Sequence, residues 1–391
     1  MEWTAARIRL FRAQGLCLAQ DQFAKALGFT KRTIGNAERG AHPPSLALRR
    51  ALDHAFEKAT TAQRDRFLAA DHDPAPAIPR ANPTLESLEL LRHTEATELG
   101  TGTLDQLEEL IEQLGIEYFT LPPAQFRETA LSWRRYVTRL LGGTLTLRER
   151  RHLYAVAGWL SGLIAEASLA LGEPAESHCT TALSLAQETG DTRLAGWVRG
   201  TQAQTALYTG DPREAVTYAQ AGRETAPIGS AALVRACTHE ARASARLGDR
   251  VGTQEGLDAA EHAWNVLSQP LVRSIYSLGA SYLPYCAATS FVWLGDTANA
   301  RMWASRAVEP TGNQPEPSVG RATARIDLAI ALAQDSELEE ASTVGLEALG
   351  ICAQRLTLPA RRRIEELMAT LRPFTEPCVV ELREQWRWIS S

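Results

Sequence analysis

A short turn motif that recurs along the second half of the chain constrains the fold more than any other feature of this 391-residue sequence. Five copies stand between runs of helical periodicity: GEPAES at 172, GDPREA at 210, GDRVGT at 248, GDTANA at 295 and SELEEA at 336. Their intervals are 38, 38, 47 and 41 residues, and a small residue follows five positions after the start of each copy. Self-similar helical hairpins at such intervals predict an all-α chain with a solenoid over residues 147–375.

A second informative stretch, LCLAQDQFAKALGFTKRTIGNAERG at residues 16–40, predicts two short helices joined by a tight turn. Gln20 begins the first helix and Gly28 lets the chain turn where a side chain would clash. Thr30 is a good N-cap for the second helix, and Gly40 ends it.

The second of these helices has one apolar face and one polar face. Ile34 and Ala37 have the spacing of core residues. The opposite face carries the hydrogen-bonding side chains Lys31, Arg32, Thr33 and Asn36. In a helix that enters the major groove, Arg or Lys can bond guanine and Asn can bond adenine.

This stretch resembles the repressor-like (Xre, or Cro/C1-type) helix-turn-helix family over about residues 3–70. The positions that match its pattern are Gln20, Ala24, Gly28, Thr30, Ile34, Glu38, Arg39 and Gly40. The resemblance implies a five-helix domain with a double-stranded DNA operator as its partner. The DNA-binding residues that it implies are Gln20, Thr30, Lys31, Arg32, Thr33, Asn36 and Arg39. Among them, Gln20 and Arg39 occupy positions that usually hold phosphates, and the others lie at or near the base-reading positions.

Two residues depart from the family pattern. Gly35 replaces a bulkier residue and weakens the helix by roughly 1 kcal/mol. Ala37 replaces a large apolar residue, so that some packing must come from elsewhere. The alternative interpretation is that Lys31 and Arg32 belong to an ordinary solvated helix face.

The remaining sequence divides into further parts. Residues 1–70 form the DNA-binding domain, 71–83 a proline-rich linker, 84–146 a helical connector with helices at 85–99, 104–114 and 123–141, 147–375 the repeats, and 376–391 a capping helix. The repeats resemble tetratricopeptide repeats in a stretched form, since the usual period is 34 residues. An irregular helical array remains the alternative.

The first helix of each repeat would line the inner surface of such a solenoid. Positions about thirteen, nine and six residues before each turn share one helix face. From this register, with one neighbouring tyrosine, the candidate ligand-binding residues are Trp159, Trp197, Gln204, Arg235, His239, Arg242, Tyr282 and Tyr285. Rings bury ligand surface, and Arg and Gln can fix a carboxylate or a peptide backbone. Alternatively, the rings pack between repeats and the arginines pair with Glu240 or Glu261.

Composition is that of an ordinary globular protein, with 45% hydrophobic and 22% charged residues. Residues 1–70 carry a net charge of +6 and the rest of the chain −11, so that only the N-terminal part suits a polyanion. We expect a cytoplasmic protein without a membrane partner, because no long uninterrupted apolar stretch and no signal-peptide core occur. The six scattered cysteines and eight histidines have no metal or redox spacing, so we expect buried free thiols, no metal and no cofactor.

The combination of the two halves predicts a function. It resembles bacterial regulators, common in high-GC genomes, whose repeat domain binds a signalling peptide or metabolite. That resemblance implies a sequence-specific DNA-binding homodimer that senses a small-molecule or peptide effector. No nucleophile elbow, P-loop, dinucleotide glycine motif or metal triad occurs, so we expect no enzyme. The alternative is a protein-interaction scaffold in which the N-terminal domain only docks or dimerises.

Overall fold

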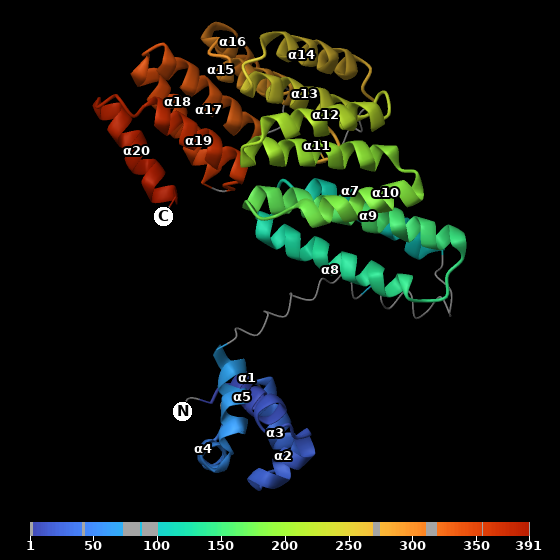
Figure 1. Ribbon diagram of the computed structural model, residues 1–391. Coiled ribbons are helices and arrows are strands. Elements are labelled where there is room, and N and C mark those ends of the chain that lie inside the picture. The colour runs from blue at the N-terminus through green and yellow to red at the C-terminus, as the bar shows by residue number, and fades with distance from the viewer. Residues whose placement is uncertain are drawn as a thin grey trace. The chain divides into compact units, whose positions relative to one another are not determined.

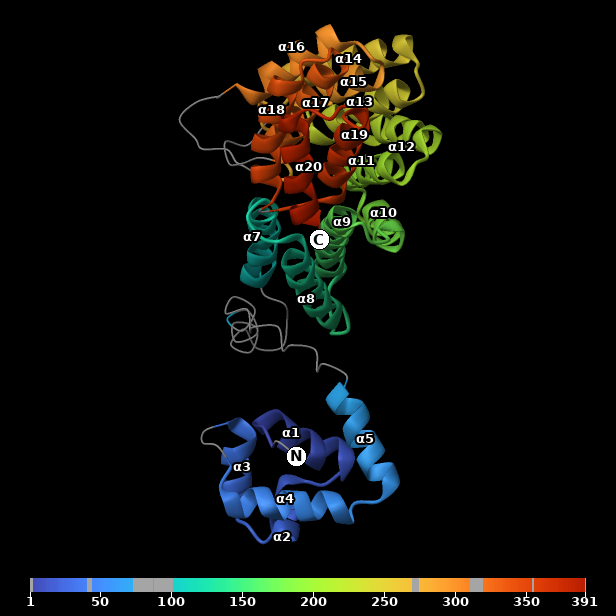
Figure 2. The same cartoon turned by 90° about the vertical axis from the view of Figure 1, so that its left-hand side faces the viewer.

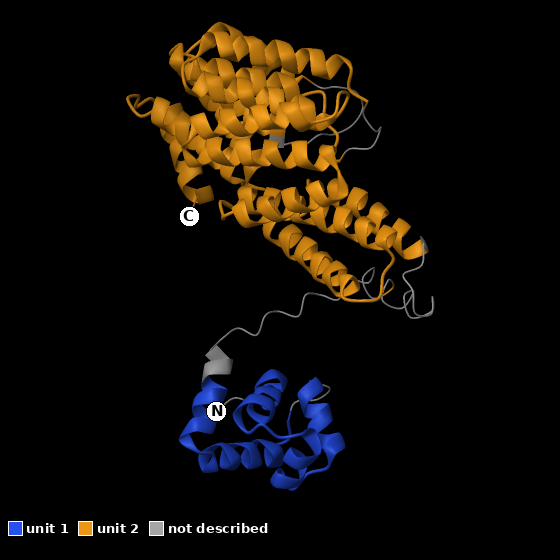
Figure 3. Ribbon diagram, turned by 45° about the vertical axis from the view of Figure 1, so that its right-hand side comes forward, with its two compact units in different colours: residues 1–86 blue, residues 87–391 orange. Residues whose placement is uncertain are grey.

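The computed structural model describes residues 3–40, 44–72, 87, 101–268, 274–309, 319–353 and 355–390. All regular structure in these ranges is helical, which confirms the predicted all-α class. The chain forms two compact units, residues 1–86 and 87–391 (Figure 3). Nearly all of the expected linker at 71–83 and of the expected helix at 85–99 lies outside the described residues.

Unit 1 consists of short helices around a small aromatic core. Its elements are α1 (Ala5–Leu10), the π-helix η1 (Phe11–Gly15), which continues directly from α1, α2 (Gln20–Leu27), α3 (Lys31–Arg39), α4 (Leu46–Lys58) and α5 (Thr61–His72). Ile34 and Ala37 are buried, as their spacing predicts, and Phe23 of α2 is buried with them. Ala37 belongs to a core cluster that is rich in rings: Trp3 and Phe11 lie 5.3 Å apart between ring centroids, and further phenylalanines join them.

The turn between α2 and α3 has the geometry that its residues favour. Gly28 and Gly40 end the two helices in the left-handed conformation, with φ of 76° and 70°. The need for glycine at position 28 comes from this backbone angle and not from crowding, because a Cβ there would meet nothing within 4 Å. The Thr30 hydroxyl accepts a hydrogen bond from the backbone N–H of Thr33 at 3.2 Å and so caps α3.

Unit 2 is a series of helical hairpins that stack one on the next (Figure 1). Its helices are α7 (Thr101–Glu117), α8 (Pro123–Leu141), α9 (Leu147–Leu171), α10 (Glu176–Thr189), α11 (Thr192–Thr209), α12 (Pro212–Thr225), α13 (Ala231–Arg246), α14 (Arg250–Asn265), α15 (Tyr282–Trp293), α16 (Thr297–Val308), α17 (Val319–Gln334), α18 (Leu338–Cys352), α19 (Leu358–Thr370) and α20 (Pro377–Ser390). Helices α9, α11, α13, α15 and α17 pack in succession, each against the next odd-numbered helix. They form the inner layer of the array.

The recurring turns have a common backbone geometry. The first residue of every copy adopts positive φ, including Ser336 at 63°, which is one of two such non-glycine residues in the described chain. In the three Gly-Asp copies the aspartate then caps the next helix; Asp249, for example, accepts from the backbone N–H of Gly252 at 3.0 Å. A glycine tolerates positive φ at the end of one helix, and the N-cap residue after it begins the next helix. This pair of residues therefore marks the turn of each helical hairpin in the sequence.

The array curves until its end meets its beginning. Helix α19 contacts both α9 and α11, and Figures 1 and 2 place it beside α11. Residues 274–281, which we call the strap, connect the region after α14 to α15 and reach α7, where the Ile275 N–H donates to the Gly115 carbonyl at 2.8 Å. These returns convert the concave side of the hairpin stack into a cavity.

Helix α9 is long and apolar enough to cross a membrane by length and composition. However, 89% of its apolar window is buried inside unit 2, where it contacts α7, α8, α10, α11 and α19. Its hydropathy is therefore that of a central core helix.

Candidate functional site

The exposed face of α3 carries the first group of predicted site residues. Lys31 and Arg32 are exposed, whereas Thr33 and Asn36 are half-buried. Within the part of unit 1 that the structure describes, Lys31 and Arg32 have no ion-pair or hydrogen-bond partner. Two cations in the first turn of a short helix are costly for the helix dipole, since that end favours negative charge. Their position is therefore not explained by stability of the helix.

Three other predicted residues are held by contacts within unit 1. The Arg39 guanidinium donates to the Asn36 amide oxygen at 2.7 Å, and the Gln20 amide donates to the Glu38 carboxylate at 2.8 Å. Thr30 serves as the cap of α3 and also shares a 2.8 Å hydrogen bond with the Thr33 hydroxyl. These contacts order the side chains next to Lys31 and Arg32 before any ligand arrives.

Glu38 anchors α3 to the rest of unit 1. It is 4% exposed, and its carboxylate accepts from the Arg12 guanidinium at 2.6 Å as well as from Gln20. The residue lies four positions after Ile34, on the buried face of α3. A charged residue on the apolar face of a helix indicates an ion pair, because a buried charge needs a partner of opposite charge.

The second site is a cavity of about 190 Å³ on the concave side of unit 2. Six of the eight predicted ligand residues line it: Trp197, Gln204, Arg235, Arg242, Tyr282 and Tyr285. They come from α11, α13 and α15, because the register of thirteen, nine and six residues before each turn places one face of each helix toward the same space. The strap, α9, α17, the segment after α7 and the segment that leads into α19 complete the wall.

Trp159 and His239 do not line the cavity, so their predicted ligand role has no support in the geometry. The Trp159 indole donates to the Asp191 carboxylate at 2.9 Å, and its ring packs edge-on against Tyr276 of the strap at 4.8 Å. His239 is fully buried and its Nε2 accepts from Arg235 at 3.4 Å. Burial and two neighbouring cations, Arg235 and Arg242, lower the pKa of His239 well below its ordinary value.

Arg235 belongs to a buried network that joins three helices. Its Nη2 lies 2.5 Å from the Glu166 carboxylate of α9 and 3.1 Å from the Gln204 amide oxygen of α11. Glu166 also accepts from the Thr201 hydroxyl at 2.6 Å. The guanidinium lies 4.3 Å from the centroid of the Trp197 ring. The alternative in which Arg235 pairs with Glu240 or Glu261 does not hold, because Arg235 pairs with the buried carboxylate of Glu166.

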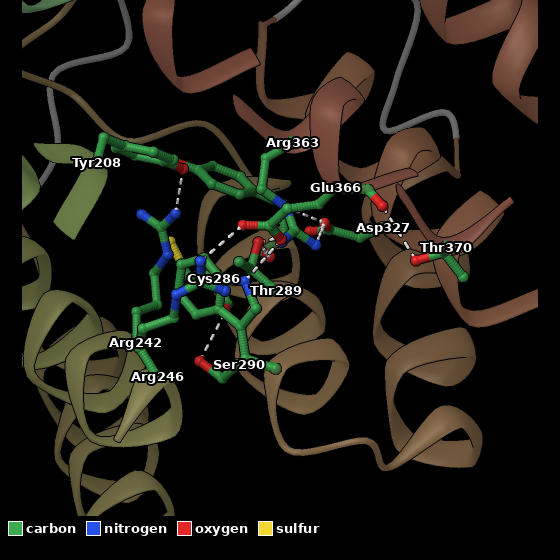
Figure 4. A network of polar contacts seen from close by, with 12 residues as sticks. Tyr208, Arg242, Arg246, Cys286, Thr289, Ser290, Asp327, Arg363, Glu366 and Thr370 are labelled. Atoms are coloured by element: carbon green, nitrogen blue, oxygen red, sulfur yellow. Dashed lines mark hydrogen bonds and ion pairs between the residues drawn. The ribbon is translucent and has the colours of Figure 1, made fainter. Parts of the chain in front are cut away.

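Arg242 is in a different electrostatic position. It is 0% exposed and donates to the Tyr208 hydroxyl at 2.5 Å (Figure 4). Its Nε and Nη1 have no hydrogen-bond partner among the described residues, and no described carboxylate forms an ion pair with it. Its guanidinium lies 5.5 Å from the centroid of the Tyr208 ring and 5.4 Å from that of the Trp293 ring.

The two carboxylates of the neighbouring polar network, Asp327 and Glu366, already have partners (Figure 4). Asp327 pairs with the fully buried Arg363 and accepts from the Thr289 hydroxyl at 2.5 Å. Glu366 pairs with Arg363, accepts from the Trp293 indole at 2.9 Å and lies 3.2 Å from the Arg246 guanidinium. None of these oxygens is left for Arg242.

Sequence reasoning missed several residues of the cavity. Tyr208 could have been found, because it lies two positions before its turn, one helical turn further along the same face as Gln204. The same extension gives Trp293, which lies beside the Arg242 guanidinium but does not line the cavity. Tyr118 follows α7, before the repeats, and Arg355 lies between α18 and α19, and the return of the chain end to the start of unit 2 brings both to the cavity.

The described residues offer no alternative metal chemistry. No group of three or more His, Cys, Asp or Glu side chains lies close enough together to hold a metal ion within the described ranges. Four of the six cysteines are buried thiols, but Cys17 is exposed, contrary to the general expectation of burial.

Comparison with protein-family models, curated proteins and solved structures found no match to this chain.

Proposed function

We propose that this protein is a sequence-specific DNA-binding transcriptional regulator in which unit 1 reads an operator and unit 2 senses a small effector. In this proposal unit 1 is a repressor-like helix-turn-helix domain and unit 2 is a tetratricopeptide-like solenoid. The observation that carries the proposal is the exposed pair Lys31 and Arg32 at the start of α3, supported from behind by the buried Arg12–Glu38 ion pair at 2.6 Å.

The chemistry of α3 suits base recognition. Exposed Lys and Arg can donate to guanine, and the Asn36 amide can bond adenine once it exchanges its contact with Arg39 for a base edge. The net charge of +6 on residues 1–70 favours phosphate binding, whereas the rest of the chain is acidic. DNA contact is therefore expected from unit 1 alone.

The sensing role is supported by the cavity of unit 2. A cavity with aromatic walls and a few converging polar groups is the usual form of a small-molecule site. Its wall is shared among α9, α11, α13, α15 and the strap, so a ligand bound there would contact several hairpins at once. A ligand that prefers one arrangement of those hairpins can change the affinity for DNA.

We further propose that the protein acts in the cytoplasm as a homodimer. Two readers on a dimer would engage half-sites separated by about one DNA turn, roughly 34 Å, or a multiple of it. Such a dimer compensates for a recognition helix that carries the weakening Gly35.

Selection of bound fragments from the organism's own genome tests the proposal. We expect the full-length protein to retain a small set of fragments with a shared palindromic sequence, and its affinity for them to fall steeply as salt rises. A scaffold with a docking domain would retain no such set and would show little salt dependence. Retention of random fragments with equal affinity would contradict sequence-specific binding.

A further inference from the structure

Arg242 is a buried cation that the described protein does not neutralise. Arginine stays protonated at all ordinary pH values, so its charge cannot be relieved by loss of a proton. Buried charges are normally paired, as Arg235 is with Glu166 and Arg363 with Asp327. Arg242 differs from these two buried arginines of the same unit, because no described carboxylate forms an ion pair with it.

The tyrosines around Arg242 do not supply the missing negative charge. Burial raises the pKa of Tyr208, Tyr282 and Tyr285 above that of free tyrosine, so all three hydroxyls are neutral near pH 7. Burial likewise raises the pKa of the Cys286 thiol. The surroundings of the guanidinium are polarizable rings and neutral hydroxyls.

The charges that line the cavity are therefore unbalanced. Arg235, Arg242 and Arg355 contribute three positive charges, and Glu166 alone contributes a negative one. Glu166 is committed to Arg235 and Thr201. Arg355 lies over the Tyr118 ring at 4.7 Å and donates to a backbone carbonyl, and its Nη2 has no partner among the described residues. The cavity is thus positive in excess and favours an anion.

The rest of the wall indicates what the anion carries. Trp197, Tyr282, Tyr285 and Leu278 present rings and an aliphatic side chain to the same space. A simple inorganic anion would leave this apolar surface in contact with water. A volume of about 190 Å³ suits a small organic molecule and excludes a folded partner.

We propose that the cavity binds a small organic carboxylate, with the carboxylate paired to the Arg242 guanidinium, whose Nε and Nη1 lack hydrogen-bond partners among the described residues, and the apolar body against the aromatic wall. Nε and Nη1 each form a two-donor edge of the guanidinium with Nη2, so a carboxylate can accept from one of them together with the N–H of Nη2 that is not donated to Tyr208. The inference rests on the proposed sensing role of unit 2 and names the chemical class that it senses.

Calorimetric titration of the full-length protein tests this assignment. The probes are 4-phenylbutanoate and octanoate, each compared with its primary amide, together with acetate and inorganic phosphate as anions without an apolar body. We expect at least one of the two acids to bind more tightly than its amide by about tenfold or more, because only the acid neutralises Arg242. Equal binding of acid and amide, or binding of phosphate as tight as that of the acids, overturns the proposal.

Three variants separate Arg242 from its neighbours. Arg242→Met keeps most of the volume and should weaken acid binding by about 30-fold or more. Arg242→Lys keeps the charge but loses the two-pronged geometry, so it should fold and bind the acids with intermediate affinity. The matched control is Arg246→Met, which removes another guanidinium from α13 that lies over Trp293 but does not line the cavity. Acid binding that survives unchanged in Arg242→Met, or is lost equally in the control, overturns the proposal.

The outcome is distinguishable from that of the proposed function. Acid binding by a protein that selects no genomic fragments would contradict DNA recognition and leave the cavity assignment standing. Sequence-selective DNA binding without preference for the acids would do the reverse.

Discussion

Glu166 of α9 and Arg235 of α13 form a buried ion pair with 2.5 Å between Oε1 and Nη2, and this pair ties together two helices whose residues are far apart in the sequence. Both side chains are almost fully buried, and the pair is completed by Thr201 and Gln204 of the helix between them. Its neighbour Arg242 has no such carboxylate. The contrast between these two arginines on one helix defines the electrostatics of the cavity.

Loss of the Glu166 charge should therefore destabilise unit 2. Glu166→Gln conserves volume but leaves the Arg235 guanidinium buried without a counter-charge, and breaking a buried pair costs about 3–5 kcal/mol. The control is Glu240→Gln, which breaks the half-exposed Arg223–Glu240 pair and should cost at most about 1 kcal/mol. Urea unfolding of both variants measures the difference. Equal losses of unfolding free energy in the two variants would show that the buried Glu166–Arg235 pair stabilises the protein no more than the half-exposed pair does.

The strap should depend on the absence of a side chain at Gly115. A Cβ there would lie 2.7 Å from Cε2 of the Tyr276 ring and would also clash with the Ser274 hydroxyl. Gly115→Ala should cost about 1–3 kcal/mol, since the strap must move off α7. Gly350→Ala in α18 is the control: its Cβ meets nothing within 4 Å, and it should stabilise the protein by up to about 1 kcal/mol. Thermal unfolding compares them, and a stabilised Gly115→Ala would contradict the packing of the strap.

His239 should make stability depend on pH below its ordinary pKa. Its folded-state pKa is lowered well below 6.5, so the unfolded chain binds the proton first as the pH falls. The contribution is fully present above pH 6.5 and is lost at up to about 1.4 kcal/mol per pH unit below it. In His239→Gln, the free energy of unfolding should fall less steeply as the pH decreases below 6.5. His178→Gln should reduce this pH dependence less, because His178 is only partly buried and its pKa is lowered less strongly. Chemical unfolding between pH 7.5 and 5.5 gives both slopes, and parallel slopes for wild type and His239→Gln would be inconsistent with a buried neutral histidine.

The sequence was informative where the cause of the structure is local. The turn at Ser336 depends on the conformation of one residue, and the structure has it where the motif predicted. The aspartate caps such as Asp249 have an equally local cause. The register that found Trp197, Gln204 and Arg242 depends only on helix periodicity.

The missing parts depend on contacts between distant segments. The partner of Arg235 is 69 positions earlier in the chain, and Arg355 reaches the cavity only because α19 returns to α9 and α11. Trp159 has the ligand register, but it is sealed behind Tyr276 because the strap crosses to Gly115. Periodicity assigns a face to a side chain and does not say which segment covers that face.

The central claim is that α3 reads bases, and it is tested most directly by the affinity of Arg32→Ala for the genomic fragment that the wild-type protein binds most tightly. We expect a loss of about 1–3 kcal/mol and relaxed preference at one or two base pairs. Lys58→Ala is the charge-matched control, since Lys58 is an exposed cation at the end of α4, and it should keep the wild-type sequence preference. If Arg32→Ala binds the fragment and its mutated versions as the wild-type protein does, α3 does not read DNA.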